Sequence, residues 1–552
     1  MTSTSWETKV AAKQQAAREK IPKDWLLPAS VTDALQFPLS EHPINMMDMP
    51  RKSGVMTERE LDITEKYTVT ELLTLMAQGD LSSLEVTVAF SKRAALAQQL
   101  LSCLTETYFA EAQERARFLD SERTQGRIVG PLHGLPISVK DGFRIKGSAS
   151  TIGYVSFLDH PLDTENSPLV DILLDLGAVI YVKTNLPQTL MTADSENNIF
   201  GRTLNPHKTC LTAGGSSGGE GSLVGFRGSP LGIGTDIAGS IRIPALCCGT
   251  YGFKPTTARV PDGGQKNPSL PGNLLFNPSA GPLANDMAAL DVLCRSVMSA
   301  RPALYDSSAL DVPWREIPKA APKLRLGLVA EDPVFPLHPP VKRALAAAVK
   351  ALEAQGHEII PISAAQAHVA DGLALAFGFF MFDDTGMKFV TDGGEPTVRS
   401  VAQSMEAYHS FKSNFLDDIA DTQGFHRIAA LNCKRELIQE NWRKMWKDHK
   451  LDGVIGPAAQ NTAIPHDTYG LPPYTLLLNV LDYPAAVLPF SKASADLDSQ
   501  PFVLGPGQSG PPYDPKATDG APASIQVFTN KMRDEECLQV AAIVDDCLRA
   551  VS

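Results

Sequence analysis

The segment AGGSSGGEGSLVGFRGSPLGIGTDIAGSIRIP, residues 213–244, decides the interpretation of this chain. Its glycines surround Ser216 and Ser240, which lets backbone N–H groups approach a ligand or a reacting oxygen without interference from a Cβ atom. Ser217 and Glu220 have the spacing of a capping box, so we expect a helix to begin there, with Ser216 just before its first turn. Ser216 would then lie beside the unpaired N–H groups of a helix N-terminus. This pattern favours catalysis by a nucleophilic serine.

Nucleotide binding is the competing interpretation of the same glycine-rich segment. The segment lacks the Gly-Lys-Ser/Thr ending of a P-loop, and Ile237 stands where a dinucleotide-binding fingerprint needs its third glycine. The pattern therefore disfavours nucleotide binding.

A serine nucleophile needs a base, and the segment itself contains none. The closest histidine in sequence, His207, lies in the turn NPHK, so a Ser-His-Asp triad would need a distant histidine to fold in. Upstream, GPLHGLPISVKDGF indicates a strand that ends at Lys140, at the carboxyl edge where α/β sheets place their sites. Burial there would lower the pKa of the lysine toward neutrality, and Ser-Lys catalysis is a recognised variant of the triad.

Three separated blocks identify the chain as similar to the amidase signature family. They are PLHGLPISVKD (131–141), GGSSGG (214–219) and GTDIAGSIRIP (234–244), and they agree with the family in order and spacing. Shorter blocks resemble the fungal acetamidases within that family: IPKDW, VKTNLPQTLM, FGRTLNP, GGEGSLVG and APASIQV. The resemblance covers most of the chain.

The resemblance implies a role for each matching residue. Ser240 would be the nucleophile, Ser216 the bridging serine on a cis peptide bond, and Lys140 the base. Backbone N–H groups would form the oxyanion hole, from Ile237, Ala238, Gly239 and Ser240.

Other matching residues would bind the substrate or support the loop. Ser216 and Leu190 would contact the substrate, while Ser217, Asp236 and Arg242 would hold the catalytic loop. Ala238 stands where many relatives carry glycine, so we expect either a negative φ or a slightly strained loop there.

The expected fold is α/β: a three-layer α/β/α amidase-signature fold with a large central mixed, mostly parallel sheet. Short β-type runs alternate with helical segments between 128 and 260, which is typical of parallel strands with helices on both faces. Residues 1–56 resemble a helical arm that wraps the larger body, and residues 57–552 form the signature domain. Capping-box spacings at Thr57/Glu60 and Ser82/Glu85, and Gly79 after a helical run, predict a helical layer at its start.

Composition limits the partners and the compartment. The 552 residues carry a formal net charge of −12, a poor basis for binding nucleic acid. Eight scattered cysteines without a CxxC pair suggest neither zinc nor a disulfide framework, and no metal or organic cofactor is implied. We find no secretory signal and no transmembrane segment, and we expect a cytoplasmic protein with a small-molecule amide substrate. A homodimer is left open.

The predicted function is hydrolysis of a carboxylic amide to a carboxylate and ammonia or an amine, through an acyl-enzyme on Ser240. An amidase or esterase acting on a bulky secondary-metabolite or fatty amide would use the same residues. An A-type subunit of a tRNA-dependent amidotransferase shares the signature, but the long arm and the acetamidase-like blocks argue against it. A non-catalytic binding protein would be expected to have lost Lys140, Ser216 or Ser240, and all three are present.

Overall fold

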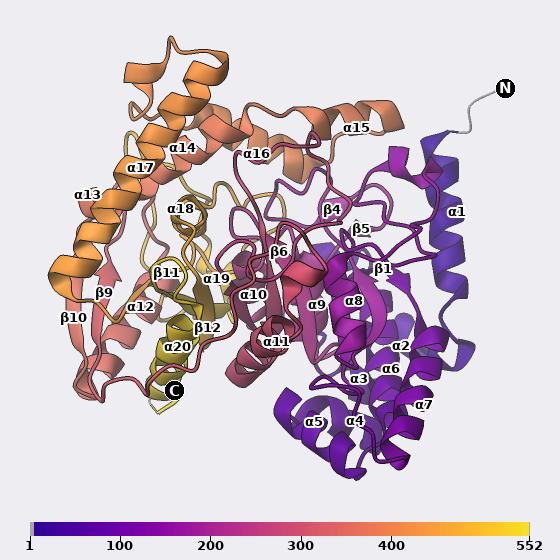
Figure 1. Ribbon diagram of the computed structural model, residues 1–552. Helices are drawn as coiled ribbons and strands as arrows, with labels where there is room; N and C mark the ends of the chain where they lie inside the picture. The colour runs from indigo at the N-terminus through magenta and orange to yellow at the C-terminus, as the bar shows by residue number, and fades with distance from the viewer. Residues whose placement is uncertain (1–4, 551–552) are drawn as a thin grey trace.

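An eleven-stranded mixed sheet forms the centre of the protein in the computed structural model, which describes residues 5–550 (Figure 1). The strand order is β1-β3-β2-β6-β8-β7-β12-β13-β11-β9-β10, and a separate two-stranded ribbon is formed by β4 and β5. The strands are β1 (Leu104–Thr107), β2 (Pro136–Lys140), β3 (Val179–Thr184), β4 (Glu196–Asn197), β5 (Gly201–Arg202), β6 (Leu231–Asp236), β7 (Tyr251–Lys254), β8 (Ser279–Ala284), β9 (Arg325–Val329), β10 (Glu358–Ile362), β11 (Gly453–Pro457), β12 (Ala485–Lys492) and β13 (Pro522–Phe528).

The α/β class and the mixed sheet are confirmed, but the expectation that parallel pairs predominate is wrong. Four neighbouring pairs are parallel: β2 with β3 and β6, and β9 with β10 and β11. The other six pairs are antiparallel. Neither the β7–β8 nor the β12–β13 connection contains a long helix of the kind that usually crosses between parallel strands.

Two layers of helices cover the sheet. On one face α6, α9 and α10 follow one another in contact; on the other face α11, α20 and α12 do the same (Figure 1). A further group, α14 with α17 and α18, packs around its own apolar core at one end of the sheet. The longer helices are α1 (Trp6–Glu19), α4 (Glu58–Lys66), α5 (Val69–Gln78), α6 (Ser83–Leu101), α7 (Phe109–Thr124), α8 (Pro168–Asp175), α9 (Gly218–Gly225), α10 (Arg242–Cys248), α11 (Met287–Ser299), α12 (Pro339–Ala354), α14 (Val369–Phe380), α15 (Thr385–Gly393), α16 (Arg399–Ser410), α17 (Gly424–His449), α18 (Pro473–Leu481) and α20 (Asp534–Arg549).

The helix-start signals in the sequence have two different outcomes. Reciprocal capping boxes form at Thr57/Glu60 and at Ser82/Glu85, and Gly79 ends α5 in the left-handed conformation, as predicted. Helix α9 does begin after Ser217, but the Ser217 side chain makes no capping bond. Its hydroxyl contacts the Thr235 backbone on β6 instead, so that capping-box prediction is wrong.

The N-terminal segment packs onto the main core. Trp25 is buried, and its ring meets Phe109 of α7 edge to face with centroids 5.2 Å apart. Gln99 of α6 binds the Trp25 carbonyl and the Leu27 N–H. The segment therefore covers the α6–α7 side of the body (Figure 1).

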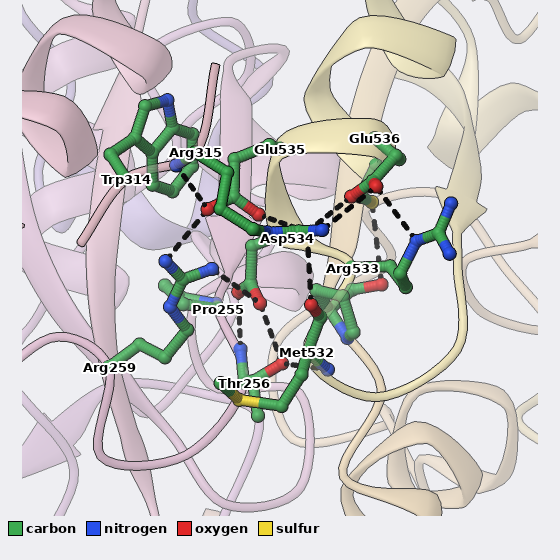
Figure 2. Close-up of polar contacts among 12 residues, drawn as sticks. Pro255, Thr256, Arg259, Trp314, Arg315, Met532, Arg533, Asp534, Glu535 and Glu536 are labelled. Atoms are coloured by element: carbon green, nitrogen blue, oxygen red, sulfur yellow. Dashed lines mark hydrogen bonds and ion pairs between the residues drawn. The ribbon is translucent and has the colours of Figure 1, made fainter. Parts of the chain in front are cut away.

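A buried ionic cluster fixes the N-terminus of α20 to the irregular segment after β7 (Figure 2). Arg259 forms ion pairs with Asp534 and Glu535 at 3.2 and 2.8 Å. Arg315 binds Glu535 from the other side at 2.6 Å, so this carboxylate joins two distant segments.

No single helix within residues 5–550 is long and apolar enough to cross a membrane. The segments Ala364–Phe380 and Thr385–Gly393 meet the length and hydropathy criteria only when taken together, and they are bent by 58° at the break between them.

Candidate active site

Lys140 is the last residue of β2 and is completely buried. Its Nζ lies 2.6 Å from Ser216 Oγ and 2.9 Å from Thr235 Oγ1. Burial lowers the pKa of Lys140 to about 7, although the charges of Asp236, Asp262 and Glu220 act in the opposite direction. Among residues 5–550 no carboxylate lies within ion-pair distance of the Lys140 Nζ, and a pKa of about 7 makes the neutral amine accessible near neutral pH.

Ser216 lies in the tight turn that leads into α9. The Gly215–Ser216 peptide bond is cis. A Cβ atom on Gly215 would lie 2.3 Å from the Thr192 carbonyl oxygen, so no side chain fits at this position. Beyond the turn, the Ser217 N–H donates to the Ser240 carbonyl at 3.1 Å, which ties the two serine-bearing turns together.

Ser240 follows β6 in a loop of free backbone donors. Its hydroxyl makes no hydrogen bond within residues 5–550, and the residue is 7% exposed. In the same range, the N–H groups of Ile237, Ala238 and Ser240 have no hydrogen-bond partner, whereas the Gly239 N–H donates to Asp236 Oδ1 at 2.8 Å. This loop can therefore offer three free N–H groups to a developing oxyanion, and Gly239 offers none in this geometry.

The backbone of this loop explains its one alanine. Gly239 has φ of +120°, a conformation that residues with a side chain rarely adopt, whereas Ala238 is not among the residues with positive φ. Of the two alternatives expected for Ala238, a negative φ or a strained loop, the structure therefore supports the negative φ. Thr475 of α18 fixes the Ala238 carbonyl with a hydrogen bond of 2.8 Å.

Asp236 and Arg242 hold the loop from beneath. Both are fully buried, and the Arg242 guanidinium grips the carboxylate with two hydrogen bonds of 3.0 Å. Burial by itself raises the pKa of Asp236, but the neighbouring Arg242 charge outweighs this and holds the pKa well below its usual range. Asn479 of α18 adds a bond of 3.0 Å to the same carboxylate.

Two further carboxyl groups lie close enough to influence Lys140. Glu220 is buried on α9, where Ser138 and Thr184 donate to its oxygens at 2.5 and 2.8 Å. Burial raises its pKa to about 8. Burial likewise raises the pKa of Asp262 to about 7. Much of both groups is therefore protonated near pH 7, which limits the negative charge that would otherwise favour the ammonium form of Lys140.

The comparison with protein families agrees with this geometry. Residues 85–538 match the family model described as Amidase. The chain belongs to the amidase family. An amidase from Gibberella moniliformis is 38% identical over 553 residues, covering all of both chains. An acetamidase from Aspergillus oryzae is 34% identical over 564 residues, covering 99% of this chain and all of that one. This amidase-family chain is thus an amide-hydrolysing enzyme.

Solved structures support the same conclusion for the fold. A fatty acid amide hydrolase has a TM-score of 0.87 and 29% identity, with 98% of this chain and 95% of that chain covered. A bacterial aryl acylamidase of the amidase signature family has a TM-score of 0.67 at 21% identity, with 88% of this chain and 96% of that one covered, which supports the fold alone.

Leu190 was predicted to contact the substrate. It is partly buried against an apolar cluster that contains Tyr154, Phe157 and Val390. Its contact with a substrate stays a prediction.

Several residues of this amidase site were missed from the sequence. Thr235 contacts Lys140, Asn479 and Thr475 bind the backbone and side chain of the loop after β6, and the charge of Glu220 affects the pKa of Lys140. Thr235 lies near the end of β6, just before the loop that carries Ser240. Its place in the sequence could therefore have marked it as a residue near the site. Asn479 lies in the mostly apolar helix α18, where a half-buried amide indicates a specific partner.

Proposed function

We propose that this chain hydrolyses a carboxylic amide to a carboxylate and ammonia or an amine, through an acyl-enzyme on Ser240. The proposal depends on one observation: a buried lysine amine, without an ion-pair partner in the described chain, lies 2.6 Å from the Ser216 hydroxyl. A neutral amine in that position can accept a proton through Ser216.

The proposed reaction has two stages. In the first, Lys140 takes the Ser216 proton while Ser216 takes the proton of Ser240, whose Oγ attacks the amide carbonyl. The protonated relay then gives a proton to the leaving nitrogen as the C–N bond breaks, which leaves the acyl group on Ser240. In the second, water attacks the acyl-enzyme through the same relay and restores the three residues.

The oxyanion of the tetrahedral intermediate would be stabilised by the loop between β6 and α10. The free N–H groups of Ile237, Ala238 and Ser240 support this role. In comparable sites the loss of one such donor costs about 3 to 4 kcal/mol of transition-state stabilisation. Asp236 occupies the Gly239 N–H and so helps to hold the other donors in place.

Amide hydrolysis on a fatty acyl group is the second candidate. It is favoured by the similarity to a fatty acid amide hydrolase at 29% identity. Relatives named acetamidase match over nearly the whole chain and favour a short acyl group instead. Turnover of short aliphatic, aryl and long-chain primary amides separates these candidates. A cytoplasmic location stays a prediction.

A fluorophosphonate probe tests the nucleophile. We expect labelling of the wild-type protein at Ser240, located by mass spectrometry, and no labelling of the Ser240→Ala protein. Lys140→Ala should lower amide turnover at least a thousandfold while the protein stays folded. Labelling that persists in Ser240→Ala would exclude Ser240 as the nucleophile.

A further inference from the structure

A cavity of about 440 Å³ lies between α16 and three other segments of the chain, residues 192–194, 467–470 and 510–512. Helix α16 lies above the end of the sheet that carries the catalytic loop (Figure 1). The volume is that of a site for a small molecule. None of the residues assigned above to catalysis lines this cavity.

One wall of the cavity lies against the turn that carries Ser216. Its wall residue Thr192 places a carbonyl directly against Gly215, the residue before Ser216. Its wall residue Tyr469 packs in the same apolar cluster as Ile241 and Ile243, just after Ser240. A substrate held by Ser240 could therefore extend a substituent toward this space.

The lining is polar and rich in hydroxyl groups. Hydroxyl-bearing side chains come from Thr192, Ser400, Ser404, Ser410, Thr468 and Tyr469. Thr192 and Ser404 already bind each other at 3.0 Å. Ser400 Oγ and Gln403 Oε1, both in the wall, have no hydrogen-bond partner in residues 5–550, and Ser400 is 3% exposed. A buried polar atom without a partner is unfavourable, so both side chains would gain stability from a hydrogen-bond partner that they can reach by rotating toward the cavity.

The lining of the cavity contains carboxylates but no cationic side chain. Three carboxylates line it, from Asp194, Glu406 and Asp467. Asp467 forms an ion pair with Arg202 at 2.8 Å, and Asp194 forms a hydrogen bond with His466 at 3.2 Å. Such a lining disfavours a carboxylate or phosphate substituent and offers no continuous apolar wall for an alkyl chain.

We infer that this cavity is a subsite for a neutral hydrogen-bonding substituent, a hydroxyl or second carboxamide, on the amide substrate. The inference rests on the proposed hydrolysis at Ser240 and adds the substrate class to it. Substrates with such a substituent should be preferred to plain alkyl amides of the same carbon chain.

Matched amide pairs test the inference. Hexanamide is compared with 6-hydroxyhexanamide for the acyl side, and N-butylacetamide with N-(4-hydroxybutyl)acetamide for the amine side. We expect kcat/KM to be about tenfold higher for the hydroxylated member of at least one pair, as one additional hydrogen bond provides. The pair that shows the preference identifies which part of the substrate enters the cavity. Equal or better turnover of the alkyl member in both pairs would overturn the inference.

Two variants on α16 connect that preference to the cavity. Gln403→Leu removes a polar wall group, and Ala407→Leu fills the space. Each should reduce the preference for the hydroxylated amide to about twofold or less. Ala402→Leu is the matched control, because Ala402 is exposed on the same helix outside the cavity, and it should leave the preference unchanged. Loss of turnover by the same factor for both members of a pair would overturn the inference.

Binding to the Ser240→Ala protein separates this inference from the proposed reaction. Calorimetry with 6-hydroxyhexanamide should detect binding that Ala407→Leu abolishes in the Ser240→Ala background. If the wild-type protein hydrolyses no amide but this binding persists, the reaction proposal fails and the subsite remains. If amides are hydrolysed but the hydroxylated compound binds no better than hexanamide, the subsite fails and the reaction remains.

Discussion

Lys140 should set the pH dependence of amide turnover. The proposed reaction needs its neutral form, and burial lowers its pKa to about 7. We therefore expect kcat/KM to rise about tenfold per pH unit below 7 and to level off above it. His207→Asn is the control, because histidine also titrates near this pH; it should leave the midpoint in place, since His207 binds the Cys248 carbonyl and not the relay. A flat profile from pH 5.5 to 8.5 would contradict the assignment.

The lowered pKa of Lys140 also makes the stability of the fold depend on pH. Unfolded lysine binds its proton with a pKa near 10.5, and folded Lys140 with a pKa of about 7. Between these two values the unfolded state binds more protons than the folded state, so the buried lysine lowers the stability of the fold. This destabilisation is complete below pH 7 and decreases as the pH approaches 10.5. Lys140→Met should thus be more stable than the wild type at pH 7, and this difference should shrink by pH 10.

Arg242 should be important for stability as well as for loop geometry. Both Arg242 and Asp236 are fully buried, so Arg242→Met would leave a buried carboxylate without its cation. We expect a loss of about 3 to 5 kcal/mol in the free energy of unfolding, measured with urea. Arg301→Met removes an exposed ion pair with Asp311 and should cost about 1 kcal/mol or less. Equal effects of the two substitutions would contradict the importance of burial.

The residues proposed for catalysis could be selected from the sequence more readily than the residues that contact them. Lys140, Ser216 and Ser240 occur in blocks whose order and spacing are specific. Thr475 and Asn479 reach the oxyanion loop from α18, more than 230 residues away, and only tertiary packing brings them there. The hydrogen bond from the Gly239 N–H to Asp236 Oδ1 likewise depends on the geometry of the loop and could not be predicted from the order of the residues.

At the scale of elements, helix α6 depends on its capping box. Ser82 Oγ accepts the Glu85 N–H at 3.0 Å, and the Glu85 carboxylate returns a bond to the Ser82 N–H at 2.9 Å. Ser82→Ala should weaken the start of the helix by about 1 kcal/mol. Hydrogen exchange in residues 83–90 should then quicken about fivefold if local opening limits it. Ser121→Ala, within α7, should leave exchange unchanged because alanine suits a helix interior; equal quickening there would contradict the capping role.

The contrast with α9 shows where local patterns stop being sufficient. Ser217 and Glu220 have the same spacing as Ser82 and Glu85, but their side chains serve the sheet. Glu220 binds hydroxyls on β2 and β3, and a Cβ on Gly232 of β6 would lie 2.0 Å from its carboxylate. Contacts with β2, β3 and β6 thus replace the capping box that Ser217 and Glu220 could have formed. Strand direction was also beyond local patterns: β12 and β13 pair antiparallel through a long irregular connection that carries no directional signal.

At the scale of the whole molecule, the N-terminal segment is part of the fold through a few specific contacts. Buried apolar residues between Ile21 and Met56 belong to the same apolar core as the sheet, whereas Val10 packs in a separate small cluster. Lys13 and Lys20 form ion pairs with the nearly buried Glu106 of β1. From a short amphipathic helix followed by a Pro-rich connector, the sequence predicted an arm that wraps a larger body. Which side of the body it covers could not be predicted, since Phe109 and Gln99 lie in helices with no distinguishing pattern.

Trp25 should decide whether this arm stays attached. Trp→Ala at a buried site costs about 3 to 5 kcal/mol, and here the loss falls on the contact with Phe109 rather than on the sheet. We expect Trp25→Ala to make residues 26–43 sensitive to limited proteolysis while the body from residue 57 onward stays resistant. Phe37→Ala, on the same segment but 62% exposed, should leave the cleavage pattern unchanged. Simultaneous digestion of the body in Trp25→Ala would contradict this prediction. It would mean that the arm and the sheet unfold as one cooperative unit, because the strands are not stable once the arm no longer covers the apolar core that they share.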